Sequence, residues 1–396
     1  MISPNDRILT RISDAELQRR WTAVRSAMKD QGIDALVMQN TSDWIGGTVR
    51  WFTDLPATNG YPRTVIFYAD EPMTVIEMGP MGKRTAFDND PLNRGVGEQL
   101  CTPSFVSIVY THSYDAELAV EALERRDLRT IGLVGKGAMP HALVEALEQG
   151  LSDAELVDAT ELVDGIKAIK SLEELDLIRR CAEMQDDIFA AVLKTIKPGL
   201  RDIDVTAVAQ ETALRLGSEQ GIFLGGSSPV GIRSSFVPRF MQGRTLAKGD
   251  HLSLLIEVNG PGGMYTEIAR TIVLGRASNE LKDGFEAVRQ AQDHTLSLMK
   301  PGARPKDIHA AHNVFMTQRG LPPELRLYAH GQGYDMVERP MIRSDETMPI
   351  AANMNFAVHP GYETPSIFAV ICDNYIVGEN GPGDCLHKTP KQVFEL

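Results

Sequence analysis

Four ionisable side chains in the C-terminal half of the chain stand in strand-like runs where apolar residues would be expected. Glu257 ends the run HLSLLIE, and Glu267 lies ten residues later, after a Gly-Pro-Gly-Gly stretch that predicts a hairpin. His330 is framed by glycines in AHGQG, and His359 stands in MNFAVHPG. Carboxylates beside an imidazole can exchange protons with a substrate near neutral pH. These four residues are therefore our candidates for catalysis.

Several neighbouring residues are candidates for contacting a substrate. They are Tyr265, two residues before Glu267; Glu338, in the charged segment after AHGQG; and Cys372 and Asp373, in the run ICDN. The glycine-rich segment 221–233 lacks the signatures of a phosphate or dinucleotide loop, so we expect it to be a loop that lines the cleft.

Each candidate also has a structural explanation. A glutamate in a strand usually faces solvent, and a single histidine in a strand is usually a hydrogen-bonded structural group. The functional interpretation is favoured because these polar residues fall in comparable strands of one repeated unit. In that unit, Lys197-Pro198-Gly199 and Lys300-Pro301-Gly302 are offset by 103 residues, as are Gly217 and Gly320. We therefore expect two related helix–helix units, each followed by strands.

The remaining elements predict two domains. Residues 14–31 carry a helical pattern that ends at Gly32, and residues 34–39, 64–70, 73–78 and 130–135 are strand-like, with a helical segment at 141–150. Strands that alternate with helices are typical of an α/β domain. Ser171 and Glu174 have the spacing of a capping box, so a long helix is expected to follow, ending near Pro198-Gly199. We place the boundary just before that helix.

The bulk composition excludes several classes of protein. The 396 residues carry a net charge of −13, which argues against a nucleic-acid partner or an anionic membrane. No apolar run approaches the ~20 residues of a membrane span, and the polar N-terminal segment does not resemble a signal peptide. The four scattered cysteines without a CxxC pair favour a reduced, cytoplasmic compartment.

The C-terminal half resembles the pita-bread fold shared by methionine aminopeptidases, proline-specific peptidases and creatinase, and the N-terminal half resembles the creatinase/prolidase N-terminal domain. The segments that carry the resemblance are GIKAIKSLEELDLIRRCAEM, KPG, LAKGDHLSLLIEV, GGMYTEIARTIVLG, AHGQG and DNYIVGENG. The resemblance implies an α/β domain over residues 1–163 and a pseudo-twofold α+β catalytic domain over residues 164–396. It also implies a hydrolase that acts on C–N bonds in a small-molecule substrate.

The chain departs from the metal-ligand pattern of the family it resembles. Metallopeptidases of this fold hold two metal ions with two aspartates, a histidine and two glutamates. The first aspartate falls at or next to Glu257, the second is Glu267, and the histidine is His330. The two glutamates are replaced by His359 and Cys372. Because two adjacent cations need bridging carboxylates, the resemblance does not imply a two-metal peptidase here.

Further positions follow from the same resemblance. Two family histidines are replaced, one by Arg239 in VPRF and one by Val337. In related two-domain enzymes the N-terminal domain reaches into the active site of the partner subunit, so Trp44 and Trp51 are candidates for substrate or dimer contacts. The alternative is that both are core tryptophans. A homodimer is expected from the resemblance alone.

Three interpretations of the site follow. In the first, which we predict, a metal-independent hydrolase cleaves a C–N bond in a small polar nitrogen-containing metabolite. His330 is then the general acid/base. Glu257 and Glu267 hold a nitrogen or activate water, and His359 with Arg239 binds a carboxylate or stabilises an oxyanion.

In the second interpretation, Glu267, His330 and His359 hold one zinc or iron ion, with Glu257 or Cys372 as a further ligand. The reaction is then a hydrolysis or the elimination of a lyase. In the third, the chain is a non-catalytic peptidase homologue that binds a ligand.

Overall fold

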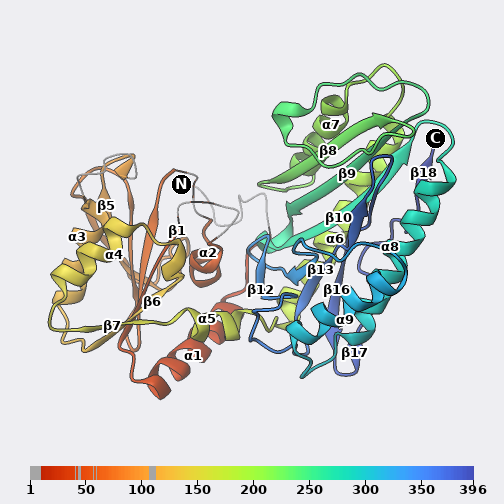
Figure 1. Cartoon of the computed structure of the whole chain (residues 1–396). Helices are drawn as coiled ribbons and strands as arrows, with labels where there is room; N and C mark the ends of the chain where they lie inside the picture. Colours follow the sequence, from red (N-terminus) through yellow and green to blue (C-terminus); the bar gives the residue numbers. More distant parts are fainter. Residues whose placement is uncertain (1–9, 41, 43–45, 57, 59, 107–112) are drawn as a thin grey trace. The chain divides into compact units, whose positions relative to one another are not determined.

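The computed structural model describes all residues except 1–9, 41, 43–45, 57, 59 and 107–112 (Figure 1). Trp44 lies outside the described residues. The chain divides into two compact units, unit 1 ending at Lys167 and unit 2 covering Ala168–Leu396. The structure divides after residue 167, whereas the sequence predicts the domain boundary after residue 163. No helix in the described part of the chain is long and apolar enough to span a bilayer.

Unit 1 is built on a mixed seven-stranded sheet with the order β4-β5-β3-β2-β1-β6-β7. β1 runs parallel to β6 and antiparallel to β2, and helices α3 and α4 bury apolar residues against the sheet. The α/β class is confirmed. The elements are β1 Ala35–Asn40, β2 Arg63–Tyr68, β3 Met73–Met78, β4 Arg84–Ala86, β5 Val96–Thr102, β6 Thr130–Val134, β7 Glu155–Asp158, α1 Asp14–Gln31, α2 Thr48–Thr53, α3 Tyr114–Glu124, η2 Lys136–Ala138, α4 His141–Gly150 and α5 Thr160–Lys167.

The first helix forms where its sequence signals place it. The Ser13 side chain accepts a hydrogen bond from the Glu16 backbone N–H, which caps the helix N-terminus. Gly32 ends the helix in the left-handed region, with φ of 67°. Trp51 in α2 is fully buried, as a core tryptophan would be.

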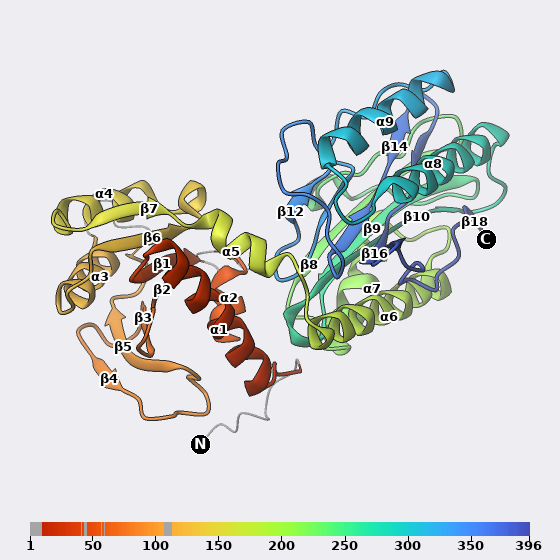
Figure 2. The same cartoon turned by 90° about the horizontal axis from the view of Figure 1, so that it is seen from below.

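Unit 2 contains two larger sheets, a two-stranded sheet of β14 and β15, and two helix pairs. One sheet has the order β18-β10-β9-β8 and the other β12-β11-β13-β16-β17. An isolated bridge between Ala269 and Cys372 joins them. Figure 2 shows α6 and α7 on one side of these strands and α8 and α9 on the other. The elements are α6 Leu172–Thr195, α7 Asp202–Arg215, β8 Gly221–Pro229, η3 Arg239–Met241, β9 Asp250–Asn259, η4 Pro261–Gly263, β10 Tyr265–Val273, α8 Asn279–Leu298, α9 Pro305–Gln318, β11 Ala329–Gly331, β12 Glu338–Met341, β13 Asn355–Val358, β14 Gly361–Glu363, β15 Phe368–Val370, β16 Asp373–Gly378, β17 Gly381–Pro382 and β18 Phe394–Glu395.

The internal repeat of the sequence is a repeat of structure. Gly199 and Gly302 follow α6 and α8, and both have a positive φ, of 94° and 87°. The N–H of Gly199 donates to the carbonyl of Leu246, and that of Gly302 donates to the carbonyl of Ile350, both at 2.8 Å. The same turn is therefore built twice, which confirms the pseudo-twofold organisation.

The segment predicted to be a cleft loop is mostly a strand. Residues 221–229 form β8, which pairs antiparallel with β9. The glycines allow the neighbouring backbone to come close. A Cβ at Gly221 would lie 2.4 Å from the carbonyl oxygen of Glu257, and a Cβ at Gly226 would lie 1.9 Å from the carbonyl oxygen of Ser235. The loop prediction was therefore wrong.

Candidate active site

The two glutamates of the β9–β10 hairpin lie opposite one another. The strands pair antiparallel with Glu267 in register with Glu257. Side chains at opposite positions of an antiparallel pair lie on the same face, within contact distance. Glu257 is 5% exposed and Glu267 is 3% exposed, since helices and neighbouring strands cover both faces of the hairpin. Two carboxyl groups are thus held together away from bulk water.

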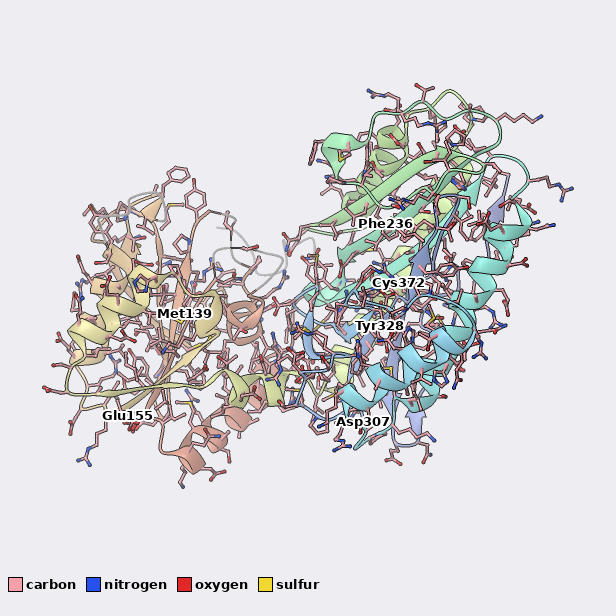
Figure 3. The ribbon with its side chains drawn as sticks, in the orientation of Figure 1. Met139, Glu155, Phe236, Asp307, Tyr328 and Cys372 are labelled. Carbon is pink, nitrogen blue, oxygen red and sulfur yellow. The ribbon has the colours of Figure 1, made fainter. Side chains whose placement is uncertain are left out.

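Both histidines lie beside this carboxyl pair. His330 is in β11, and the N–H of His359, just after β13, donates to the carbonyl of Tyr328 at 2.6 Å. The two imidazole rings meet edge to face with centroids 5.1 Å apart. His330 Nε2 lies 3.8 Å from Glu267 Oε2. Figure 3 labels Tyr328 and Cys372, which directly precede strands β11 and β16 of unit 2.

Two amide side chains fix the glutamates in place. Asn374 Oδ1 accepts the N–H of Glu267 at 2.7 Å, and Asn374 Nδ2 donates to Gln332 Oε1 at 2.8 Å. Gln332 Nε2 in turn donates to Glu257 Oε1 at 2.7 Å. The sequence interpretation missed both amides. The available signal was the position of Gln332 within AHGQG, two residues after His330 and directly after β11.

Burial controls the proton occupancy of the cluster. Burial and the charge of Glu267 raise the pKa of Glu257 well above its ordinary value, against a hydrogen bond from Gln332. Burial raises the pKa of Glu267 to about 7 and lowers the pKa of His330 to about 4. Burial and the neighbouring His330 hold the pKa of His359 well below its usual range. Burial therefore shifts the two carboxyl groups toward their protonated form and the two imidazoles toward their neutral form.

These shifts predict opposing effects of pH on the stability of the metal-free protein. Glu267 binds its proton more tightly when folded, so its stabilisation is complete below its ordinary pKa of 4.5 and is lost as the pH rises to about 7. His330 contributes stability above its ordinary pKa of 6.5, and this is lost as the pH falls to about 4. Between pH 4.5 and 6.5 the two slopes oppose each other.

We expect single substitutions to expose the two slopes. On acidification from pH 6.5 to 4.5, Glu267→Gln should lose stability relative to the parent protein, and His330→Gln should gain it. Urea unfolding midpoints across this range, after dialysis against a chelator, measure both effects. Midpoint curves that run parallel for all three proteins would contradict the assigned shifts.

The polar groups of Cys372 and Asp373 are bound by other groups of the protein. Cys372 is fully buried and its thiol donates to the carbonyl of Glu267 at 3.5 Å. Burial, together with the charge of Glu267, raises the pKa of the thiol well above its ordinary value. Asp373 forms an ion pair with Arg270 at 2.6 Å in which neither side chain is exposed, and its other oxygen accepts a hydrogen bond from Gln292. Both oxygens of the Asp373 carboxylate are therefore bound within the protein and not presented to a substrate.

The glycines around His330 allow close packing behind it. A Cβ at Gly331 would lie 2.7 Å from the carbonyl oxygen of Arg339. A Cβ at Gly333 would lie 2.8 Å from both Glu338 and Lys170. Glu338 is buried and forms an ion pair with Lys170 at 2.6 Å. The carboxylate of Glu338, a candidate for contacting a substrate, is therefore engaged by a lysine inside the protein.

Two further substrate-contact candidates lie elsewhere in unit 2. Arg239 is exposed in η3 and donates a hydrogen bond to Gln210 of α7, so its guanidinium is engaged away from the two glutamates. Tyr265 opens β10, is almost fully buried, and its N–H donates to the carbonyl of Gly333 at 2.7 Å. Tyr265 thus supports the segment that carries His330.

The donor atoms fit one metal ion and not two. Atoms of Glu267, His330 and His359 converge within 4.8 Å of one another, and His359 Nε2 is buried without a hydrogen-bond partner among the described residues. A second ion would need the bridging carboxylates that His359 and Cys372 replace. A second convergent group, Asp373, Cys385 and His387, lies nearby in sequence, but Arg270 already occupies the Asp373 carboxylate.

Comparison with known families identifies the chain. The profile described as metallopeptidase family M24 matches residues 176–379, and the creatinase/prolidase N-terminal domain matches residues 20–169. The chain therefore belongs to metallopeptidase family M24. This membership confirms the expected family and the expectation of an enzyme of the C–N hydrolase class.

Individual relatives cover most of the chain. An uncharacterized peptidase of Bacillus subtilis is 27% identical, over 71% of this chain and 79% of its own length. A creatinase of a Bacillus species is 26% identical, over 84% of this chain and 78% of its own length. The crystal structure of an X-Pro aminopeptidase from Thermotoga maritima superposes with a TM-score of 0.77 at 17% identity, covering 95% of this chain and 99% of that one. The last comparison confirms the two-domain fold with its pita-bread unit.

Proposed function

We propose that the protein hydrolyses a C–N bond in a small polar nitrogen-containing metabolite without a metal ion. One observation carries the proposal: buried Glu257 and Glu267 face one another, with His330 Nε2 3.8 Å from Glu267 Oε2. Proton-transfer partners in catalysis need hydrogen-bond reach, directly or through one water, and this distance leaves room for a bridging group.

The proposed roles follow from the proton positions. His330 Nδ1 lies 2.9 Å from the carbonyl of Gly331, to which it donates as the N–H tautomer, so its Nε2 faces Glu267 as an acceptor. His330 takes a proton from the attacking water as the new C–O bond forms. Glu267, with a pKa of about 7, gives a proton to the leaving nitrogen as the C–N bond breaks. Glu257 holds the nitrogen of the substrate through the oxygen that Gln332 leaves free.

A single bound metal ion is the second candidate, and the unpartnered Nε2 of His359 favours it. Glu267, His330 and His359 would hold the ion. A zinc or iron ion there would supply a Lewis acid or an activated water. His330 Nδ1 would keep its contact with the Gly331 carbonyl, the kind of outer contact that orients a ligating histidine.

Metal analysis joined to an activity screen separates the two candidates. We expect the purified protein to hold substoichiometric metal after incubation with zinc, iron or manganese. We also expect release of an amine or ammonia from at least one member of a panel of small amides, amidines and ureas, at a rate that a chelator does not change. If the parent protein instead holds one equivalent of metal, and the Glu267→Ala/His330→Ala double variant loses it, the metal-independent proposal is wrong and the single-metal site is supported.

The proposal includes a homodimer in the cytoplasm. Phe240 is 86% exposed and Met241 is 60% exposed in η3, which is unusual for large apolar side chains and supports association through this face. The four scattered cysteines, with no CxxC pair, support the cytoplasmic part of the proposal.

A further inference from the structure

A second feature of unit 2 is a cavity of about 500 Å³. Its apolar walls include Phe236 and Phe368, whose rings meet edge to face with centroids 5.1 Å apart, and Tyr362. Its charged lining comes from Glu324, Arg326 and Glu363. The cavity therefore combines an aromatic wall with one cationic side chain.

The cavity is lined by residues of the two segments that lead to His330 and away from His359. Ala329 pairs with Val358 and the carbonyl of Tyr328 accepts the N–H of His359, so the same antiparallel pairing brings Arg326 opposite Gly361. A Cβ at Gly361 would lie 2.8 Å from Arg326 Nη2, which confirms that the two residues touch. Gly361 lies two residues after His359. The cavity wall is thus a direct continuation of the segments that carry the two histidines.

One further contact ties the cavity to the strands of the cluster. Phe236 packs against the buried group that contains Ala269, Ala357 and Cys372. Ala357 lies opposite His330 in the β11–β13 pairing, and Ala269 lies two residues after Glu267 in β10.

The guanidinium of Arg326 is held by one edge. Its Nε and Nη2 donate to the two oxygens of Glu324 at 2.9 and 2.6 Å, and Glu324 is 3% exposed at its side chain. Nη1 has no partner among the described residues, and the Arg326 side chain is 44% exposed. Gly361, without a Cβ, leaves room for this placement. Arg326, which lines the cavity, is therefore oriented by Glu324 and keeps Nη1 unused by the described residues.

We propose that Arg326 binds the carboxylate of the substrate while Phe236, Tyr362 and Phe368 bind an apolar part of the same molecule. The inference rests on the proposed function and narrows its substrate class to small acids that carry an apolar group. Glu363 does not oppose such an anion, because it pairs with Arg233 at 3.4 Å and accepts a hydrogen bond from Ser235 at 2.8 Å.

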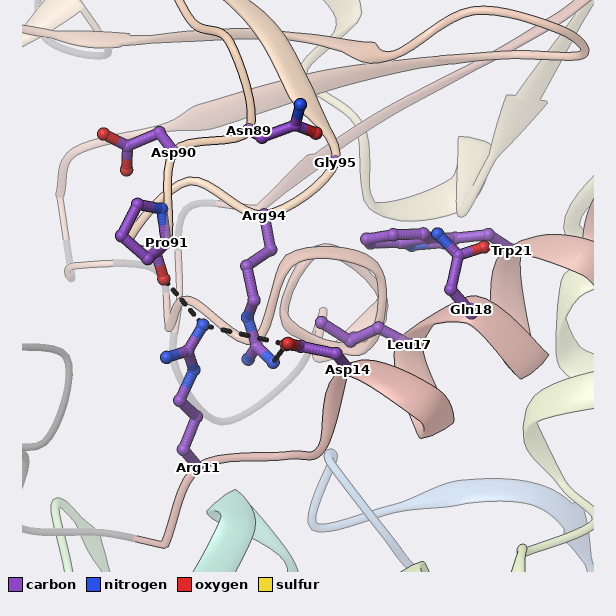
Figure 4. Close-up of a pocket in the computed structure, with 10 residues that line it drawn as sticks. All are labelled: Arg11, Asp14, Leu17, Gln18, Trp21, Asn89, Asp90, Pro91, Arg94 and Gly95. Atoms are coloured by element: carbon purple, nitrogen blue, oxygen red, sulfur yellow. Dashed lines mark hydrogen bonds and ion pairs between the residues drawn. The ribbon is translucent and has the colours of Figure 1, made fainter.

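A cavity in unit 1 offers no comparable site. It has a volume of about 310 Å³, and Figure 4 shows Arg11 and Arg94 within it. Arg11 donates to the carbonyl of Pro91, and Arg94 is neutralised by Asp14 and Asp54. In that cavity Arg94 pairs with two carboxylates and Arg11 lies near one of them, whereas Arg326 pairs with a single carboxylate, that of Glu324.

Binding of a matched acid and amide tests the proposal without turnover. Isothermal titration at neutral pH with hydrocinnamate and its neutral amide should show the acid bound about tenfold more tightly, or more, by the parent protein. Arg326→Gln should abolish this preference. Because Arg326→Gln leaves buried Glu324 unpaired, the Arg326→Gln/Glu324→Gln double variant repeats the measurement with both charges removed. Arg215→Gln, on an exposed ion pair of α7, is the control and should keep the preference.

The outcomes distinguish this inference from the proposed function. Equal affinity for acid and amide in the parent protein, no binding of either, or a preference that survives in the folded double variant would each overturn the role of Arg326. A preference that depends on Arg326 supports it even if no amide is hydrolysed, since that result would contradict only the proposed reaction.

Discussion

Replacing His330 with glutamine is expected to lower kcat by about 10²- to 10⁴-fold, the usual contribution of a positioned acid or base. The imidazole Nε2 faces Glu267 at 3.8 Å, and an amide nitrogen or oxygen at that place cannot accept a proton at neutral pH. Initial rates of amine release, on a substrate found in the amide screen, give kcat and KM separately. KM should change little, because glutamine keeps a polar group in the same space.

His309→Gln is the matched control for this prediction. His309 is a half-buried histidine of α9, and its Nε2 contacts Asn313 and no member of the Glu–His cluster. Its substitution should leave kcat within about twofold of the parent value, as for most substitutions away from a special site. Retention of full kcat in His330→Gln would remove His330 from the proposed reaction. A fall in both variants would indicate a general loss of folded protein.

Replacing Arg270 with methionine is expected to destabilise the protein by about 3–5 kcal/mol, the cost of leaving a buried charge without its partner. Neither Arg270 nor Asp373 is exposed. Although burial raises the pKa of Asp373, the charge of Arg270 and a hydrogen bond with His387 lower it below its ordinary value, so the carboxylate is ionised. The Arg270 guanidinium also donates to the carbonyl oxygens of Ala269, Cys372, Thr389 and Pro390.

The urea midpoint of unfolding measures this effect, and two further variants interpret it. Asp373→Leu combined with Arg270→Met removes both charges and should recover much of the loss. Glu211→Gln breaks an exposed ion pair with Arg215 and should change the free energy of unfolding by less than about 1 kcal/mol. An Arg270→Met variant as stable as the parent would mean that Asp373 is neutral in the folded protein.

Local sequence signals predicted much of unit 2. The Ser171 side chain and Glu174 form the complete capping box at the start of α6, because a cap depends on residues three apart. The Gly-Pro-Gly-Gly stretch joins β9 to β10, and the hairpin register then places Glu257 opposite Glu267. The glycine-rich segment 221–229 was predicted to be a loop but forms strand β8. Glycine is common in loops, and in a sheet it also allows two backbones to pack closely, so the residue type alone does not distinguish the two.

The roles of the charged residues depended on partners distant in the chain. Glu338 is 168 residues from Lys170, and Asp373 is 103 residues from Arg270. No local pattern pairs such residues, so both carboxylates were taken as substrate contacts. Arg326 was missed for the same reason, because its importance depends on the cavity and on Gly361 across a strand pairing.

The sequence alone determined the family fold, the repeat and the four residues Glu257, Glu267, His330 and His359 as the polar centre of unit 2. The repeat and the four residues follow from the spacing of motifs along the chain, and the family fold follows from the resemblance of whole segments such as AHGQG and DNYIVGENG. The tertiary structure decided the protonation of that centre, since burial and not residue type moves the pKa of Glu267 to about 7 and that of His330 to about 4. It also decided which neighbouring charges are bound inside the protein and which one, Arg326, keeps a donor edge for a ligand.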